Sequence, residues 1–292
     1  MKTAFEPTAP RSDLFPLFSL VIQLFDNAIG IWLNSILSSI TAMLVFFFVN
    51  RIIQSLGLMS KLSNIPMLVM GLFYFLIPTG INSPVLWLIL WLTVLFMRQC
   101  VAIISEDRSN VTIVNAAFIC GVATLVYPFA AAGGFVLLAV VLLSGAADLR
   151  ALMLTLVGFS LPLYIVWAIQ YIFWPDTLRF WDVPFESYSW FSNQAIVSLG
   201  LFTLVVVSSV ANNARILAVV TLRERRKWQL QLIMFAVATL AGLIGGISVF
   251  IVLGFIPAAI ILSRTFASYP GKWFPETIFI ALVFLVVITP LL

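Results

Sequence analysis

The sequence predicts an all-α protein, a polytopic transmembrane helix bundle with about ten spans. Of its 292 residues, 63% are hydrophobic and only 9% are charged. Almost every Lys, Arg, Asp and Glu falls in a short gap between long apolar runs. The runs are roughly 17–25 residues long, the length of a helix that crosses a hydrocarbon core about 30 Å thick. Because lipid cannot hydrogen-bond to an exposed backbone, each run is expected to be helical.

The apolar runs predict one transmembrane domain over residues 28–292, preceded by an N-terminal part over residues 1–27. The candidate spans are 28–50, 64–79, 84–104, 111–127, 129–143, 151–174, 193–217, 228–246, 248–263 and 275–291. Spans 129–143 and 248–263 are short for a bilayer. We therefore expect these helices to be tilted, kinked or partly buried by their neighbours.

The N-terminal segment 14–25 is too short to span comfortably. Ser19, Gln23 and Asp26 recur at helical spacing and give a narrow polar stripe on an otherwise apolar helix. That pattern is typical of an amphipathic helix lying in the membrane interface. The alternative is a re-entrant or broken first span.

The distribution of Lys and Arg predicts the orientation. In the ten-span order, one side carries Arg51, Lys61, Arg98, Arg108, Arg150, Arg215, Arg223, Arg225, Arg226, Lys227, Arg264 and Lys272. The opposite side carries Arg179, together with Lys2 and Arg11 if the N-terminal tail lies there. Positive residues stay in the cytoplasm during insertion, so the Arg-rich loops are expected to be cytoplasmic and loop 175–192 to lie outside.

Three stretches of the chain carry a family resemblance. They are VNRIIQSLGLMSKLSNIPMLVMGLFYFLIP, NSPVLWLILWLTVLFMRQCVAI and NAAFICGVATLVYPFAAAGGFVLLAVVLLSGAADLRALMLTLVGFSLPLYIVWAIQYIFW. Their matching features, in order, are Asn50, Asn82, Asn115, Tyr127-Pro128, Leu149-Arg150, Gly158 and Leu161-Pro162. Over roughly residues 17–190 the chain resembles a Bacteroidota multi-pass family catalogued as domain of unknown function 6427. The resemblance implies an inner-membrane protein of a Gram-negative cell, with loop 175–192 in the periplasm and a role in envelope biogenesis. It implies no activity.

The residue types present exclude several kinds of chemistry. The chain has no His, which excludes His-based acid–base catalysis, haem ligation by His and His-rich zinc sites. No ionisable side chain lies near the middle of a predicted span, which argues against ion-coupled transport. Cys100 and Cys120 are interpreted as small apolar packing residues, because a metal site needs more ligands. No metal site and no cofactor is therefore expected.

The outer loop 174–191 gathers acidic and aromatic residues. Its weak catalytic candidates are Asp176, Asp182 and Glu186, and its binding candidates are Arg179, Trp181 and Trp190. The plainer interpretation is an aromatic belt at the membrane interface. The functional one is an outer-leaflet site, where the aromatic rings stack on sugars or a lipid stem. A carboxylate there acts as a general base or holds a metal ion at a diphosphate, and Arg179 clamps a phosphate.

A second cluster comprises Arg223, Arg225, Arg226 and Lys227. We expect it to bind anionic lipid head groups on the cytoplasmic side, at about 1 kcal/mol per basic residue near the surface. The alternative is a phosphate-bearing ligand or an acidic partner protein. The cluster is too short for nucleic-acid binding, and the net charge of +4 mostly reflects the positive-inside bias.

These observations leave three functions open. The first is a non-enzymatic component of an envelope-biogenesis assembly, with membrane lipids and other inner-membrane proteins as partners. The second is a membrane enzyme of the polymerase, ligase or glycosyltransferase type, acting on a polyprenyl- or lipid-linked saccharide at the outer face. The third is an uncoupled lipid or solute facilitator. It would use the amides and hydroxyls within the spans, which otherwise form interhelical hydrogen bonds.

Overall fold

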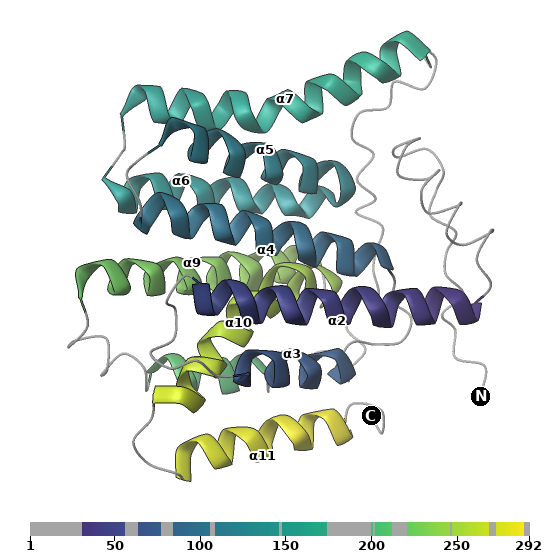
Figure 1. The fold of residues 1–292 in the computed structure, drawn as a ribbon, viewed down its shortest axis with the longest axis vertical. Helices are drawn as coiled ribbons and strands as arrows, with labels where there is room; N and C mark the ends of the chain where they lie inside the picture. Colours follow the sequence, from purple (N-terminus) through teal and green to yellow (C-terminus); the bar gives the residue numbers. More distant parts are fainter. Residues whose placement is uncertain are drawn as a thin grey trace.

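The computed structural model describes residues 31–55, 64–76, 84–105, 109–145, 148–173, 200, 202–211, 221–245, 247–268 and 273–288. The helices are α2 (Ile31–Ser55), α3 (Ile65–Leu76), α4 (Pro84–Ser105), α5 (Asn110–Val126), α6 (Ala132–Ser144), α7 (Leu149–Phe173), α9 (Leu222–Gly245), α10 (Ile247–Ser268) and α11 (Trp273–Ile288), with a 3-10 turn at Pro128–Ala131 (Figure 1). Phe202–Ala211 is a further apolar helix. The predicted interfacial helix, and all of residues 1–27, lie outside the described residues.

The predicted class is confirmed, because the described part of the chain is helical and holds no strand. Five helical segments are long and apolar enough to cross a membrane: Ile36–Ser55, Leu86–Ser105, Leu149–Ile169, Leu222–Ile244 and Val249–Ala267. The other helices are shorter and apolar. The chain is therefore a multi-pass membrane protein, and the count of ten spans stays a prediction.

Three helices extend further than hydropathy predicted. α2 runs on to Ser55, α9 begins at Leu222, and α10 continues to Ser268. Each extension carries basic residues that we had assigned to gaps, such as Arg51 and Arg264. Hydropathy ends a span at the first charge, whereas a helix continues as long as its backbone hydrogen bonds do. Long basic side chains favour this continuation, because they can reach water from a helix end.

Glycine and short polar side chains mark the ends of the middle helices. α6 ends at Gly145, whose φ of 71° is left-handed and therefore favours a residue without Cβ. The Asp148 side chain then caps α7, since its Oδ1 accepts a hydrogen bond from the Ala151 backbone N–H at 2.8 Å. Thr221 begins α9 in the same way, with its Oγ1 accepting from the Glu224 N–H at 3.4 Å.

Helix α10 lies at the centre of the described bundle and packs against α9, α3 and α4. Of its segment Val249–Ala267, 89% is buried, whereas only 17% of Leu149–Ile169 in α7 is buried. Pro257 lies inside α10 and removes one backbone hydrogen-bond donor in mid-helix. The predicted burial of span 248–263 by its neighbours is thus confirmed.

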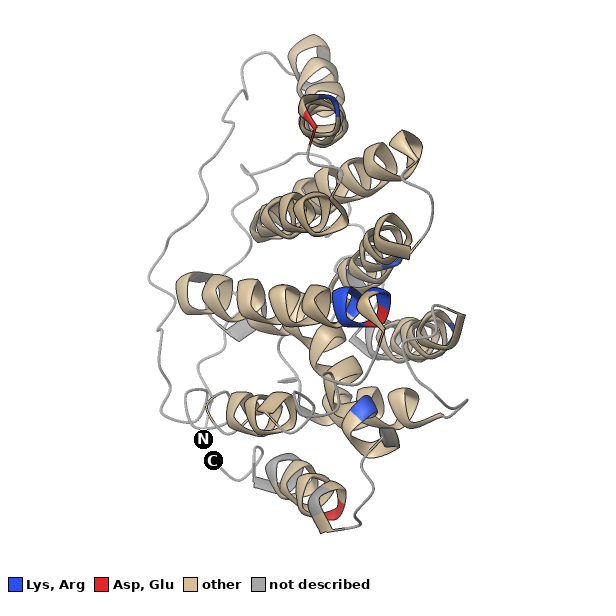
Figure 2. Ribbon diagram, turned by 90° about the vertical axis from the view of Figure 1, so that its left-hand side faces the viewer, with Lys and Arg blue, Asp and Glu red and all other residues tan. Residues whose placement is uncertain are grey.

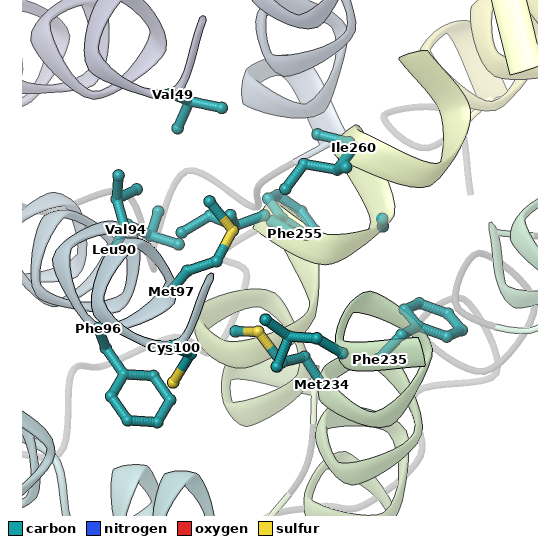
Figure 3. Packing of buried hydrophobic residues seen from close by; sticks show 14 of the residues in the cluster. Val49, Leu90, Val94, Phe96, Met97, Cys100, Met234, Phe235, Phe255 and Ile260 are labelled. Carbon is teal, nitrogen blue, oxygen red and sulfur yellow. The ribbon is translucent and has the colours of Figure 1, made fainter. Parts of the chain in front are cut away.

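Aromatic and aliphatic side chains fill the space around α10. Phe73 of α3 lies 5.0 Å from both Phe202 and Phe255 between ring centroids, and Phe250 lies 5.9 Å from Phe235 of α9. Figure 3 shows side chains from α2, α4, α9 and α10 converging on this region. Because lipid tails are as apolar as these side chains, the helices are held by close packing more than by the hydrophobic effect.

Glycines allow the closest helix contacts. A Cβ at Gly121 of α5 would meet the backbone carbonyl oxygen of Phe159 in α7, and would lie 2.5 Å from Pro162 Cγ. A Cβ at Gly158 of α7 would in turn lie 2.8 Å from Ala117 Cβ on α5. Because each helix has a glycine at the contact, α5 and α7 can approach each other closely.

Glycine plays the same part between α9 and α10. A Cβ at Gly242 of α9 would lie 2.7 Å from Phe250 Cβ of α10. This is a close helix contact of the small-residue type. Figure 1 also shows a bend in α7, which contains Gly158 and Pro162, so that its second half leads away from the other helices.

We predict that Gly121→Ala destabilises the protein by about 1–3 kcal/mol, the range typical of overpacking, because its methyl group meets backbone atoms of α7 that cannot move independently. Gly71→Ala in α3 is the matched control, since a Cβ there meets nothing within 4 Å. Thermal unfolding in detergent should show a lower midpoint for Gly121→Ala and an unchanged or higher one for Gly71→Ala. Equal midpoints for the two variants would contradict the α5–α7 contact.

Candidate functional site

The acidic and aromatic candidates of the outer loop lie outside the described residues. These are Asp176, Arg179, Trp181, Asp182, Glu186 and Trp190. Their roles at an outer-leaflet site stay predictions. The basic candidates, in contrast, belong to described helices.

The basic cluster forms the first two turns of α9. Arg223 and Arg225 are exposed, while Arg226 and Lys227 are half-buried. The structure thus brings together the four residues that we assigned to anionic head groups, on one helix end next to the exposed carboxylate of Glu224. Their long side chains can reach anions in several directions from this helix end.

Every Lys and Arg in the described ranges lies at one end of the bundle. This end comprises the final turns of α2, α4 and α10 and the first turns of α7, α9 and α11, and we call it the basic end (Figures 1 and 2). Its acidic residues are Asp148, Glu224 and Glu276. The shared end agrees with the predicted distribution of charge between the two faces. A cytoplasmic position for this end stays a prediction.

One basic residue at this end is not on the surface. The Arg264 side chain in α10 is only 8% exposed, and its guanidinium carbon lies 4.3 Å from the centroid of the Trp228 ring. A cation over an indole face is worth about 0.5–2 kcal/mol, and more when the pair is shielded from water. The contact also shows that the end of α10 lies beside the start of α9.

Two side chains on this part of α9, Trp228 of the pair and Gln231, have polar atoms without hydrogen-bond partners within the described part of the chain. The Trp228 indole N–H is buried without an acceptor, and neither Oε1 nor Nε2 of Gln231 has a partner. Gln231 is completely buried. Because residues three apart lie on one face of a helix, Trp228 and Gln231 both belong to the buried face of α9. An unsatisfied buried polar group costs about 1–3 kcal/mol, so this arrangement calls for an explanation.

A small pocket lies farther inside, between α4, α5, α6, α9 and α10. Its volume is about 30 Å³, and its walls include Phe96, Ala123, Val136, Met234 and Leu253. Two polar side chains in its walls form hydrogen bonds with backbone carbonyls. The Thr93 hydroxyl donates to Ile89 O at 2.9 Å, and the Cys120 thiol donates to Ala130 O at 3.6 Å. The pocket has space for only one or two water molecules.

The cysteines behave as predicted for packing residues. Cys100 and Cys120 are both buried and both free thiols. Over the described ranges no group of three or more His, Cys, Asp or Glu side chains is placed to hold a metal ion.

Sequence reasoning missed the combination of Arg264, Trp228 and Gln231. We treated Arg264 as a topogenic charge in a gap and did not consider Gln231. One signal was available: Gln231 lies three residues after Trp228, between Leu230 and Leu232, inside a predicted span. Hydropathy does not predict that α9 pairs with α10, and it is this pairing that places Arg264 over the Trp228 ring.

We predict that Gln231→Leu stabilises the protein in zwitterionic lipid, by about 1–3 kcal/mol, because it removes two buried polar atoms that have no partner. Gln229→Leu is the matched control, since Gln229 is exposed on the same helix. Thermal unfolding in phosphatidylcholine nanodiscs should give a higher midpoint for Gln231→Leu only. A lower midpoint for this variant would mean that the amide has partners after all.

Comparison with protein-family models, with curated proteins and with solved structures finds no match to this chain.

Proposed function

We propose that the chain is a non-enzymatic component of a multi-protein assembly in the inner membrane, with its basic end in the cytoplasm. The observation that carries the proposal is the exposure of α7. This helix is long enough to cross a membrane, yet it packs closely on α5, contacts α6 less, and most of its surface is exposed. The family resemblance supports a place in envelope biogenesis.

The exposed surface of α7 carries a ladder of aromatic rings. Tyr164 lies 5.9 Å from Trp167 between ring centroids, and Trp167 lies 5.8 Å from Tyr171. All three side chains are at least 37% exposed. Rings at a spacing of three or four residues form one stripe along a helix. Large, stiff rings with polar tips are the side chains that protein interfaces favour.

The attachment of α7 to the bundle is compatible with such a contact. Its inner face is fixed to α5 through Gly121 and Gly158, so that the opposite face is presented at a defined angle. The bend near Pro162 directs the half that carries the aromatic ladder away from the other described helices. We therefore infer that this half of α7 contacts a helix of a partner membrane protein.

We predict that the triple variant Tyr164→Leu, Trp167→Leu and Tyr171→Leu loses the partner. The substitutions keep α7 apolar but remove its rings, and we expect at least tenfold weaker association, or about 1.4 kcal/mol. The measurement is quantitative mass spectrometry of proteins that co-purify with the tagged chain in mild detergent. The control is Phe279→Leu with Phe284→Leu, which removes exposed rings from α11.

A partner present at a fixed ratio in the wild type and the α11 control, and absent in the α7 variant, would support the proposal. Equal recovery from all three proteins, or no partner with the wild type, would refute it.

The saccharide-enzyme alternative makes an opposite prediction. If the chain only scaffolds an assembly, joint Asp176→Ala, Asp182→Ala and Glu186→Ala should leave both partner recovery and the cell's surface glycans unchanged. The glycan profile of a deletion strain carrying this variant is the measurement. Loss of a glycan with intact folding and intact partner recovery would favour the enzyme.

A further inference from the structure

We propose that Arg264, Trp228 and Gln231 form a binding site for a phosphate group at the basic end of the bundle. The site is separate from the aromatic ladder of α7 and does not depend on the proposed scaffold role. It differs from diffuse attraction by the surface cluster, because its three side chains are more than nine-tenths buried.

Two of the three side chains, Trp228 and Gln231, carry buried hydrogen-bond donors without acceptors in the described ranges, and the third is a guanidinium. The guanidinium of Arg264 has five N–H donors, the Trp228 indole has one, and the Gln231 amide has two. In the described ranges, the Trp228 N–H and the Gln231 amide have no hydrogen-bond partner. The contact recorded for Arg264 is with the Trp228 ring, at 4.3 Å. A phosphate provides several acceptor oxygens, and a planar guanidinium can bind two of them at once.

The charge balance points to the same kind of ligand. A buried guanidinium is costly unless a negative charge lies nearby, and the ring of Trp228 compensates only part of that cost. Glu224 of α9 provides an attractive negative charge for Arg264, but it is exposed and flanked in the sequence by Arg223 and Arg225, which share that charge. An anion entering this region meets an excess of positive charge before it reaches Arg264.

A purely intramolecular explanation accounts for one of the three groups. Arg264 is attracted by Glu224 and lies close to the end of α10 at Ser268, where its charge compensates the negative end of the helix dipole. That effect leaves the Trp228 N–H and the Gln231 amide unsatisfied. A phosphate bound where Arg264 of α10 lies against Trp228 of α9 would accept hydrogen bonds from donors on both helices. A hydroxyl on the same ligand would also donate to Gln231 Oε1, which favours a phosphodiester with a neighbouring hydroxyl, such as a phosphoglycerol head group.

The same chemistry occurs in two sources, a lipid head group and a soluble phosphate. The position of the site, near the helix ends that carry the surface cluster, is where lipid head groups lie beside a membrane protein. We therefore use both probes and let the measurement separate them.

The experiment measures the thermal unfolding midpoint of the full chain in three settings. These are phosphatidylcholine nanodiscs, phosphatidylcholine nanodiscs with phosphatidylglycerol, and phosphatidylcholine nanodiscs with inorganic phosphate in the buffer. A ligand that binds only the folded protein raises its midpoint. We expect phosphatidylglycerol to raise the midpoint of the wild type. We also expect native mass spectrometry to find phosphatidylglycerol retained after detergent extraction.

The variants test whether the rise comes from the buried site. Trp228→Phe removes the N–H and keeps a ring, and Gln231→Leu removes the amide. Both should lose the rise and retain at least tenfold less lipid. Arg264→Lys tests the guanidinium fork with the charge kept, and we expect it to lose most of the rise. The control is Gln229→Leu, which should keep the rise. Arg225→Gln with Arg226→Gln removes half of the surface cluster and should lower the rise without abolishing it.

Each outcome decides the proposal. A rise with phosphatidylglycerol, or with inorganic phosphate alone, that is lost in Trp228→Phe and Gln231→Leu supports the site and identifies the source. A rise that survives in these two variants but disappears in Arg225→Gln with Arg226→Gln means that only diffuse surface attraction operates, and it overturns the proposal. The absence of any rise in the wild type overturns it as well. Trp228→Phe and Gln231→Leu each leave a large apolar side chain in the core, although Phe is smaller than Trp, so the rise of each variant is measured from its own midpoint in phosphatidylcholine. These two variants remain informative even if an Arg264 variant fails to fold.

Discussion

The burial of α10 is the constraint on which the rest of the described bundle depends. In lipid, an apolar side chain gains little by leaving the hydrocarbon, so a helix stays inside a bundle only if its neighbours fit it closely. Nearly all of Val249–Ala267 is enclosed. Rings from α3, α9 and the stretch Phe202–Ala211 pack around it, and Phe73 touches Phe255 directly. The position of α10 in turn places α3, α4 and α9 around a common axis.

Close approach is achieved where a side chain is missing. Gly242 brings α9 onto α10 at Phe250, and Gly121 with Gly158 brings α5 onto α7. The two contacts have different consequences. The first closes the core, whereas the second fixes a helix whose remaining surface is open. The same residue type thus builds both the interior of the bundle and the outward face on which the proposed partner contact rests.

Polar chemistry in the described helices is concentrated at the basic end. The hydroxyls within the helices mostly donate to their own backbone, as Thr93 and Thr155 do. Ser39 differs, since it forms an interhelical hydrogen bond with Tyr74 at 3.1 Å. At the basic end, Arg264 lies in the interior although the membrane–water boundary is near. Burying this guanidinium costs free energy. Because Trp228 beside it and Gln231 on the same face of α9 also have donors without acceptors, an anion with several acceptor oxygens is the ligand that we propose for this place.

Hydropathy and charge are sufficient to predict the class of this protein and the rough bounds of its helices, because a hydrocarbon core imposes helical structure on any apolar run of sufficient length. They also predict that the basic residues share one end. They do not predict helix pairing, since an apolar helix fits many apolar neighbours equally well on composition alone. Which helix becomes the buried centre is decided by local shape, as at Gly242 and Phe250. That pairing puts Arg264 over Trp228 and encloses Gln231. A binding site made from two helices is therefore a property of the tertiary structure, because no single stretch of sequence contains it.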